Sequence, residues 1–91
     1  MSVRVILATL LADRVGGKQT LEVEGTSAGE VLHRLSGDYP ALASLLWKPD
    51  GSFNPMLVVF RGDEDIRQLS GLDTPVSPKD ELTIISAIEG G

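Results

Sequence analysis

Cysteine is absent from the sequence, and histidine occurs only once, at His33. The chain therefore has no disulfide framework, no thiolate nucleophile and no cysteine-based zinc site. A single histidine also cannot build a multi-histidine metal site. The sequence holds no glycine-rich phosphate loop and no H-E-x-x-H segment. We therefore predict that the chain carries no metal site and is not itself an enzyme.

Long hydrophobic runs are also lacking. A membrane span needs about 18–20 consecutive apolar residues, and no stretch of the sequence approaches that length. The opening residues, MSVRVILATLLADR, hold a short apolar run with no small-residue cleavage pattern after it. This pattern is typical of a strand rather than a signal peptide. We expect a cytoplasmic location and no membrane partner.

Basic residues are outnumbered, since 8 Lys and Arg stand against 13 Asp and Glu, which gives a net charge of −5. Binding to a phosphate backbone needs clustered Lys and Arg, so this balance argues against a nucleic-acid partner. An acidic surface instead favours encounter with a basic partner surface. Many proteins are mildly acidic without such a partner, so the charge alone decides nothing further.

The length of 91 residues and the hydrophobic content of 42% predict one domain with a core of its own. We assign residues 1–91 to this domain and residues 87–91 to a flexible C-terminal tail. The first elements are two strands: residues 3–7 alternate in polarity, and TLEVE at 20–24 does the same. Gly16 and Gly17 supply the turn between them, as in a hairpin.

A helix follows the hairpin. Ser27 and Glu30 have the spacing of a capping box, and apolar residues then recur at positions 28, 31, 32 and 35, which is one helical face. Gly37 and then Pro40 are expected to close this helix. Pro40 can begin a second short helix that ends at Trp47, which we place at the edge of the core.

Three further strands complete the predicted fold. MLVVF at 56–60 and ELTIISAI at 81–88 are full strands, and a short edge strand is expected near 65–68. The acidic run GDED at 62–65 is interpreted as a solvated turn. One main helix on a mixed sheet is an α+β architecture. The hairpin followed by a helical crossover suggests the β-grasp arrangement, in which the first and last strands are parallel neighbours.

The alternating patterns also assign the two faces of the sheet. The residues expected in one core beneath the helix are Val3, Val5, Leu7, Leu21, Val23, Val31, Leu32, Leu35, Met56, Val58, Phe60, Leu82 and Ile84. The apolar residues expected on the opposite face are Ile6, Leu57, Val59 and Ile85. An exposed apolar cluster usually marks an interface. The alternative is that the long middle segment folds over this face and buries it.

The sequence ends in AIEGG. Gly90 and Gly91 have no Cβ atoms, so this end of the chain can pass through a narrow channel and expose its carboxylate from either side. A terminal Gly-Gly is a weak signal by itself. Attached to a β-grasp pattern it becomes a strong one.

With these features together, the chain resembles the ThiS/MoaD-type sulfur-carrier proteins, the ubiquitin-like carriers of thiamin, molybdopterin and cysteine synthesis. The resemblance covers the whole length and rests on VRVILATLLAD, TSAGEVLHRL, GDEDIRQLSGLDTPVSPKDELTI and the terminal GG. The middle section with YPALASLLW is similar to the molybdopterin and cysteine carriers. The DEDIR…GLDTP stretch is most similar to the actinobacterial cysteine-synthesis carrier. Ser86 departs from these groups, which usually have proline shortly before the tail.

The resemblance implies a carrier acted on by other enzymes. An E1-like activating enzyme would use ATP and magnesium to adenylate the Gly91 carboxylate, and sulfur would then replace AMP to leave a thiocarboxylate, a C-terminal 1-thioglycine. A second enzyme, a sulfur-acceptor synthase, would take up the sulfur. Gly90 would be needed as a slim neighbour, and the chain itself would bind no cofactor and be a monomer when free. The residues expected to contact the activating enzyme are Ile6, Val59, Ile85, Ile88 and Glu89.

Two alternatives stay open. A ubiquitin-like modifier would use the same adenylate but end in an isopeptide bond between Gly91 and a lysine. A non-covalent β-grasp binding module would need no tail chemistry at all. The sulfur acceptor is not fixed by the sequence either, since cysteine, molybdopterin, thiamin and specialised metabolites all receive sulfur from similar carriers.

Overall fold

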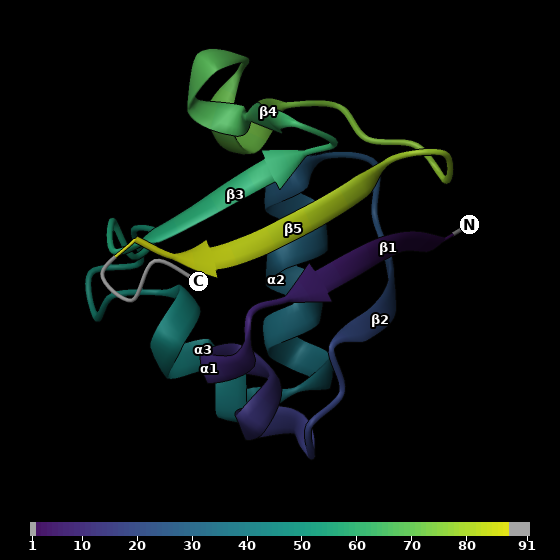
Figure 1. Ribbon diagram of the computed structural model, residues 1–91. Coiled ribbons are helices and arrows are strands. Elements are labelled where there is room, and N and C mark those ends of the chain that lie inside the picture. The colour runs from purple at the N-terminus through teal and green to yellow at the C-terminus, as the bar shows by residue number, and fades with distance from the viewer. Residues whose placement is uncertain (1, 88–91) are drawn as a thin grey trace.

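The fold is a five-stranded mixed sheet with helices packed on one face, and the computed structural model describes residues 2–87 (Figure 1). The strands are β1 (Ser2–Leu7), β2 (Thr20–Glu24), β3 (Leu57–Arg61), β4 (Glu64–Asp65) and β5 (Glu81–Ser86). The α-helices are α1 (Thr9–Ala12), α2 (Ala28–Asp38) and α3 (Pro40–Leu46), and the 3₁₀-helices are η1 (Asp13–Val15), η2 (Ile66–Gln68) and η3 (Gly71–Asp73). None of the described helices is long and apolar enough to span a bilayer.

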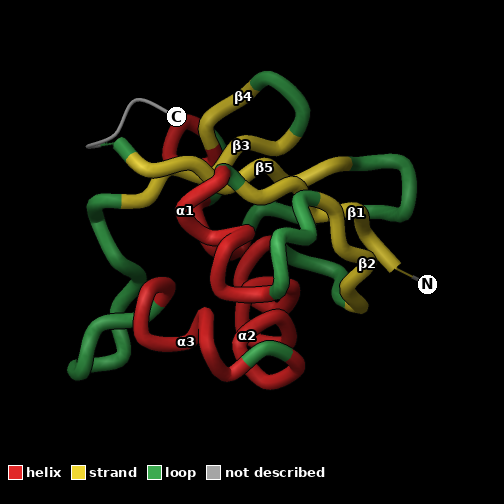
Figure 2. Tube along the Cα trace, turned by 60° about the horizontal axis from the view of Figure 1, so that its bottom comes forward, coloured by secondary structure: helices red, strands yellow, loops and turns green. Residues whose placement is uncertain are grey.

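The strand order β2-β1-β5-β3-β4 confirms the β-grasp prediction. β1 pairs antiparallel with β2 and parallel with β5, so that Val5 lies opposite Leu82. β3 pairs antiparallel with β5, whereas β4 reaches β3 only at Phe60 and Arg61. Figure 2 shows α2 and α3 together on one side of the strands. The sheet therefore has one face covered by helices and one face without them in the described chain.

The start of α2 is fixed by the predicted capping box. The Ser27 hydroxyl accepts a hydrogen bond from the Glu30 N–H at 3.1 Å, and the Glu30 carboxylate accepts one from the Thr26 N–H at 2.6 Å. These bonds satisfy backbone donors that have no partner inside the helix. The Thr26 N–H, followed by the Thr26 hydroxyl, lowers the pKa of Glu30 below its ordinary value.

The lowered pKa of Glu30 predicts how the stability of the fold depends on pH. Because the pKa of Glu30 is lower in the folded protein than in the unfolded chain, the carboxylate stabilises the fold above its unfolded pKa of about 4.3. That contribution is lost as the pH falls through the folded pKa. Glu30→Gln should therefore lower the urea midpoint at neutral pH and leave it near the parent value in strong acid, with Asp63→Asn as the charge-matched control. A midpoint difference that is independent of pH would contradict this role.

Three local predictions differ from the structure. The connection between β1 and β2 is not a plain turn, because α1 and η1 precede Gly16 and Gly17 and bury Leu11 and Ala12 in the core. Helix α2 also runs through Gly37 to Asp38, with Tyr39 at its C-terminal cap. The predicted edge strand at 65–68 is shorter than expected, since only two residues pair before η2 begins.

The main correction concerns which side chains of β3 enter the core. Leu57 and Val59 are 6% and 2% exposed, whereas Met56 is 45% exposed and Val58 and Phe60 are only partly buried. The predicted assignment of this strand was therefore inverted. The run LVVF is apolar at every position, so its alternation carries no signal. Which face of β3 is buried is decided by its pairing with β5, in which Val59 lies opposite the buried Ile84.

The remaining predicted core residues are confirmed. Val3, Val5, Leu7, Leu21, Val23, Val31, Leu32, Leu35, Leu82 and Ile84 are all buried. Leu32 lies on α2 and Ile84 lies on the central strand β5, and neither side chain is accessible to solvent. Replacing either residue with alanine should lower the free energy of unfolding by about 2–5 kcal/mol, through lost burial and the cavity that remains. Urea denaturation measures this change, and an unaltered midpoint would show that the core is assigned wrongly.

Candidate docking face and carrier tail

The face of the sheet opposite α2 carries a contiguous apolar surface. Its side chains are those that alternate with the core residues on the three central strands, and they are partly exposed. We call Ile6, Val58, Phe60, Thr83 and Ile85 the outer-face patch. Ile6 and Phe60 both lie opposite Thr83, and Val58 lies opposite Ile85, so the register places all five side by side.

The sequence predicted only part of this patch. Ile6 and Ile85 are where they were expected, but Val59 and Leu57 belong to the core. Val58 and Phe60 replace them on the outer face for the reason given above. The sequence already placed Thr83 and Ile85 on the face opposite to Leu82 and Ile84. The two faces of β3 could be assigned only from its pairing with β5, which the sequence does not show.

The alternative that the middle segment covers this face is also wrong. Helix α3 packs beside α2 on the other side of the strands (Figure 2). Trp47, which follows α3, is partly buried and packs against the core, as expected for an aromatic residue at the edge of the core. The outer-face patch is therefore left without a helix over it in the described part of the chain.

Charged residues border the patch at the end of the sheet away from the tail. The Arg4 guanidinium lies 3.2 Å from the Glu81 carboxylate and 3.6 Å from the Glu22 carboxylate. All three side chains are about half exposed, so these ion pairs contribute little to stability. They place charge at one end of the apolar surface.

Strand β5 ends at the other end of the outer-face patch. Strand β5 ends at Ser86, which is buried and lies opposite Leu57, and the Ala87 N–H donates to the Met56 carbonyl at 2.8 Å. Ile85 is thus the last residue of the patch before the chain continues toward its terminus. The predicted site residues Ile88, Glu89, Gly90 and Gly91 lie outside the described residues, as does most of the predicted tail 87–91.

The other candidate groups found in the sequence do not form a reactive site. His33 is exposed, and its ring stacks on Trp47 with centroids 4.1 Å apart. In the acidic run, Asp65 binds the Arg67 guanidinium at 2.6 Å, which lowers the pKa of Asp65. Within residues 2–87, no group of three or more His, Cys, Asp or Glu side chains is placed to hold a metal ion.

The comparisons with known proteins agree with this geometry. The model of the ThiS family matches residues 5–91, a range that ends at the terminal Gly91. The chain belongs to the ThiS family. The sulfur carrier protein CysO of Mycobacterium tuberculosis strain H37Rv is 30% identical to it over 93 residues, which covers 100% of both chains.

Two solved structures are similar to this ThiS-family chain over nearly its whole length. CysO in the BexX/CysO complex of Amycolatopsis orientalis has a TM-score of 0.85 and 29% identity, with 98% of this chain and 99% of that chain covered. SAMP1 of Haloferax volcanii has a TM-score of 0.85 and 28% identity, with 100% of each chain covered. The fold and family resemblance predicted from the sequence are therefore confirmed.

Proposed function

We propose that this chain is a sulfur carrier whose reactive atom is presented at the carboxyl group of Gly91. The observation that carries the proposal is the family match, which extends to the terminal Gly-Gly and is supported by full-length similarity to a sulfur carrier protein. Such a carrier is a substrate of other enzymes rather than a catalyst.

The proposed chemistry begins with activation of the terminal carboxylate. A carboxylate at neutral pH is a poor electrophile, because its leaving group would be oxide. In the proposed first step, a carboxylate oxygen attacks the α-phosphorus of ATP and pyrophosphate leaves. A sulfide sulfur then attacks the acyl carbon, and AMP leaves with its electron pair. A persulfide donor would instead give an acyl disulfide, from which a thiol of the partner enzyme releases the thiocarboxylate as that thiol forms a disulfide with the donor sulfur. The net change on the carrier is the exchange of one oxygen for sulfur, which gives a C-terminal 1-thioglycine.

The partner enzymes supply ATP, magnesium and the catalytic groups in this proposal. An E1-like enzyme performs the activation, and a sulfur-acceptor synthase uses the product. The Amycolatopsis CysO structure is a complex with BexX, which supports the expectation that a carrier of this shape works while bound to a second protein.

The outer-face patch is the proposed docking surface for the activating enzyme. Binding there would hold the end of β5, so that residues 88–91 could enter the partner's active site. Four residues span at most about 13–14 Å when extended, so the docked body must lie close to the reacting groups. Docking also raises the effective concentration of the carboxylate at those groups. Ile88 and Glu89 are proposed to line the entrance that the tail passes through.

A lysine in the centre of the patch should weaken this docking. Val58→Lys places an ammonium group among apolar side chains without entering the core, and it should raise the Kd for the activating enzyme about tenfold or more, since hot-spot changes cost about 2 kcal/mol or more. Calorimetry measures the Kd. Ser44→Lys on α3 is the matched control, because it adds the same charge on another exposed surface. Equal affinity of Val58→Lys and the parent protein would exclude the patch from the interface.

A second candidate function has specific support. SAMP1, a small archaeal modifier protein, matches this chain over its whole length, so a protein modifier attached to lysine through Gly91 is the alternative. Both functions need the same adenylate, but only the modifier leaves covalent adducts. A denaturing immunoblot of cells that express the chain should show a single band for a carrier and a ladder of larger species for a modifier.

The direct test of sulfur loading is the intact mass of the protein. The chain is incubated with its activating enzyme, ATP and a sulfur donor, and is then weighed. The expected result is a mass gain equal to the exchange of one oxygen for one sulfur, localised to the C-terminal peptide. If a competent enzyme produces neither an adenylate nor this gain, the proposal fails and the non-covalent binding module takes its place.

A further inference from the structure

Two large apolar side chains are clearly exposed among residues 2–87, and they lie at the same end of the sheet. Leu10 is 42% exposed and Met56 is 45% exposed. Single exposed apolar residues are common on protein surfaces and need no explanation. These two differ from scattered residues because they lie on either side of one strand end, that of β5.

Met56 lies beside the end of β5 on the β3 side. Its carbonyl accepts a hydrogen bond from the Ala87 N–H at 2.8 Å. This bond lies one position beyond the last pair of the two strands, in which Leu57 is opposite Ser86. Met56 is therefore next to the point at which the chain leaves the sheet.

Leu10 lies on the other side of the same strand end, just after β1. β1 and β5 run parallel, and the Ala8 N–H donates to the Ile84 carbonyl at 3.0 Å. Helix α1 begins at the next residue, so it starts beside the last residues of β5. Figures 1 and 2 both show α1 near this end of β5. The two residues that follow Leu10 are buried in the core, which leaves Leu10 as the exposed leucine of this helix.

This end of the molecule is built from segments without charged residues. Residues 5–12, 53–60 and 82–87 contain no Asp, Glu, Lys or Arg, although 23% of the chain is charged. The ion pairs of Arg4 with Glu22 and Glu81 lie at the opposite end of the sheet. The centres of protein–protein interfaces are depleted of charged residues and enriched in methionine. This end therefore suits an uncharged, apolar partner surface.

The length of the tail limits how far a partner can lie from this end. Residues 88–91 span at most about 13–14 Å when extended, so an enzyme that acts on Gly91 must bring its surface close to Ala87. The activating enzyme and the sulfur-acceptor synthase both act on the same terminal carboxyl group. The reach of the tail therefore places the surfaces of both enzymes against the residues that flank the end of β5.

We propose that Leu10 and Met56, which we call the tail collar, contact the apolar rim of the channel that receives the tail in both enzymes. This role rests on the proposed function and adds to it the contacts that the two partners share. Methionine suits such a role, because its unbranched and polarisable side chain adapts to surfaces of different shape. Since the same side chains serve both enzymes, one carrier molecule binds only one of them at a time. The loaded carrier leaves the first enzyme before it reaches the second.

Steady-state kinetics with variants of the full chain tests the tail collar. Leu10→Asn and Met56→Gln remove an apolar contact and add no charge. Each should raise the KM of the activating enzyme for the carrier about fivefold or more, the size of a moderate interface contact. The kcat should stay the same, because neither side chain belongs to the reacting carboxyl group. The KM of the acceptor synthase for the loaded carrier should rise in the same way.

Leu69→Asn is the matched control for these variants. Leu69 is a partly exposed leucine that follows η2, at the end of β3 away from the tail. This change should leave the KM of both enzymes at the parent value. Thermal unfolding of Leu10→Asn and Met56→Gln should match that of the parent, because both side chains are exposed.

Oxidation of Met56 tests the contact without any variant. Hydrogen peroxide converts an accessible methionine to its sulfoxide, and peptide mass mapping follows the modification at Met56. In the free carrier Met56 should oxidise readily, and in the complex with the activating enzyme without ATP it should be protected. No sulfur is transferred in this experiment, so its result does not depend on the loading chemistry.

The possible outcomes separate the tail collar from the proposed function. If a competent enzyme does not load the parent chain, the proposed function fails and the tail collar fails with it. If the parent is loaded but the two variants keep the parent KM with either enzyme, the shared contact alone is overturned. Equal oxidation of Met56 in the free and bound carrier would overturn it as well. Protection of Met56 that increases with the concentration of the free carrier would assign the collar to a contact between two copies of the chain, which also overturns it.

Discussion

A variant that lacks Gly91 is expected to lose sulfur loading completely and to unfold at the same temperature as the parent protein. The terminal carboxylate of the variant belongs to Gly90, so the acyl carbon that must reach the activating enzyme is displaced by about 3.3–3.6 Å. Misplacement of reacting groups by this much removes the advantage of a docked, oriented reactant. Stability should be unchanged, because the buried residues that hold the described fold together all lie before Ala87. Intact mass measures loading, and thermal unfolding measures stability.

Two controls make the deletion specific. Gly90→Val keeps the length and the terminal carboxylate, and it should bind the activating enzyme normally but load slowly, since a branched side chain would crowd the channel around the acyl carbon. The outer-face variant Val58→Lys should show the reverse pattern, with weakened binding and an unaltered tail. If the protein without Gly91 still gains sulfur at its C-terminal peptide, the assignment of the reactive carboxyl group is wrong.

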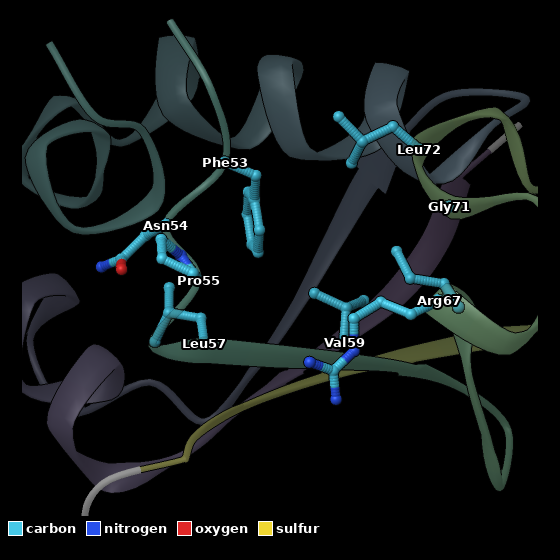
Figure 3. Close-up of a pocket in the computed structure, with 9 residues that line it drawn as sticks. Phe53, Asn54, Pro55, Leu57, Val59, Arg67, Gly71 and Leu72 are labelled. Carbon is cyan, nitrogen blue, oxygen red and sulfur yellow. The ribbon is translucent and has the colours of Figure 1, made fainter. Parts of the chain in front are cut away.

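The second large effect is expected from the buried neighbour of Val58. Val59→Lys should lower the free energy of unfolding by about 3–5 kcal/mol, the cost of a buried charge without a partner. Val59 is 2% exposed and lines a groove of about 260 Å³ between β3, residues 53–55 and the segment that holds η2 and η3 (Figure 3). Among the described residues that line this groove, Arg67 alone is ionisable. A lysine that extended into the groove would therefore meet the Arg67 guanidinium, whose neighbouring carboxylate, Asp65, is already engaged with it.

Val58→Lys is the matched control for this change, one residue away on the same strand. It adds the same charge to the opposite face and should cost about 1 kcal/mol or less, in the range of surface substitutions. Urea denaturation of both variants compares the two faces of β3 directly. Equal midpoints would contradict the register in which Val59 lies opposite Ile84.

The sequence showed which side chains are buried where apolar and polar residues alternate along a strand. In β2, Leu21 and Val23 alternate with acidic residues, so both the strand and its buried face could be read without a structure. The capping box at Ser27 and Glu30 likewise marked the start of α2, because side-chain and backbone groups that are close in sequence satisfy each other there. Such local signals depend only on neighbouring residues.

The sequence did not show which side chains are buried where every residue of a segment was apolar. Every position from Leu57 to Phe60 is apolar, so both assignments of β3 fitted the pattern equally well. The same limit hid α1, whose residues continue the apolar run of β1 and become a helix only because Leu11 and Ala12 find space in the core. In each case the outcome depends on contacts between segments that are distant in the chain.

The sequence by itself thus determined the β-grasp class and most of the core, because these follow from local periodicity and composition. The chemistry proposed for Gly91 came from the family resemblance that the sequence carries. Only the tertiary structure decided which side chains form the outer-face patch and that Leu57 and Val59 line an apolar groove on the other face of β3. Both features arise from strand register. Register is fixed by hydrogen bonds and packing between β3, β5 and β4, and a shift of one residue exchanges every side chain between the two faces of the sheet.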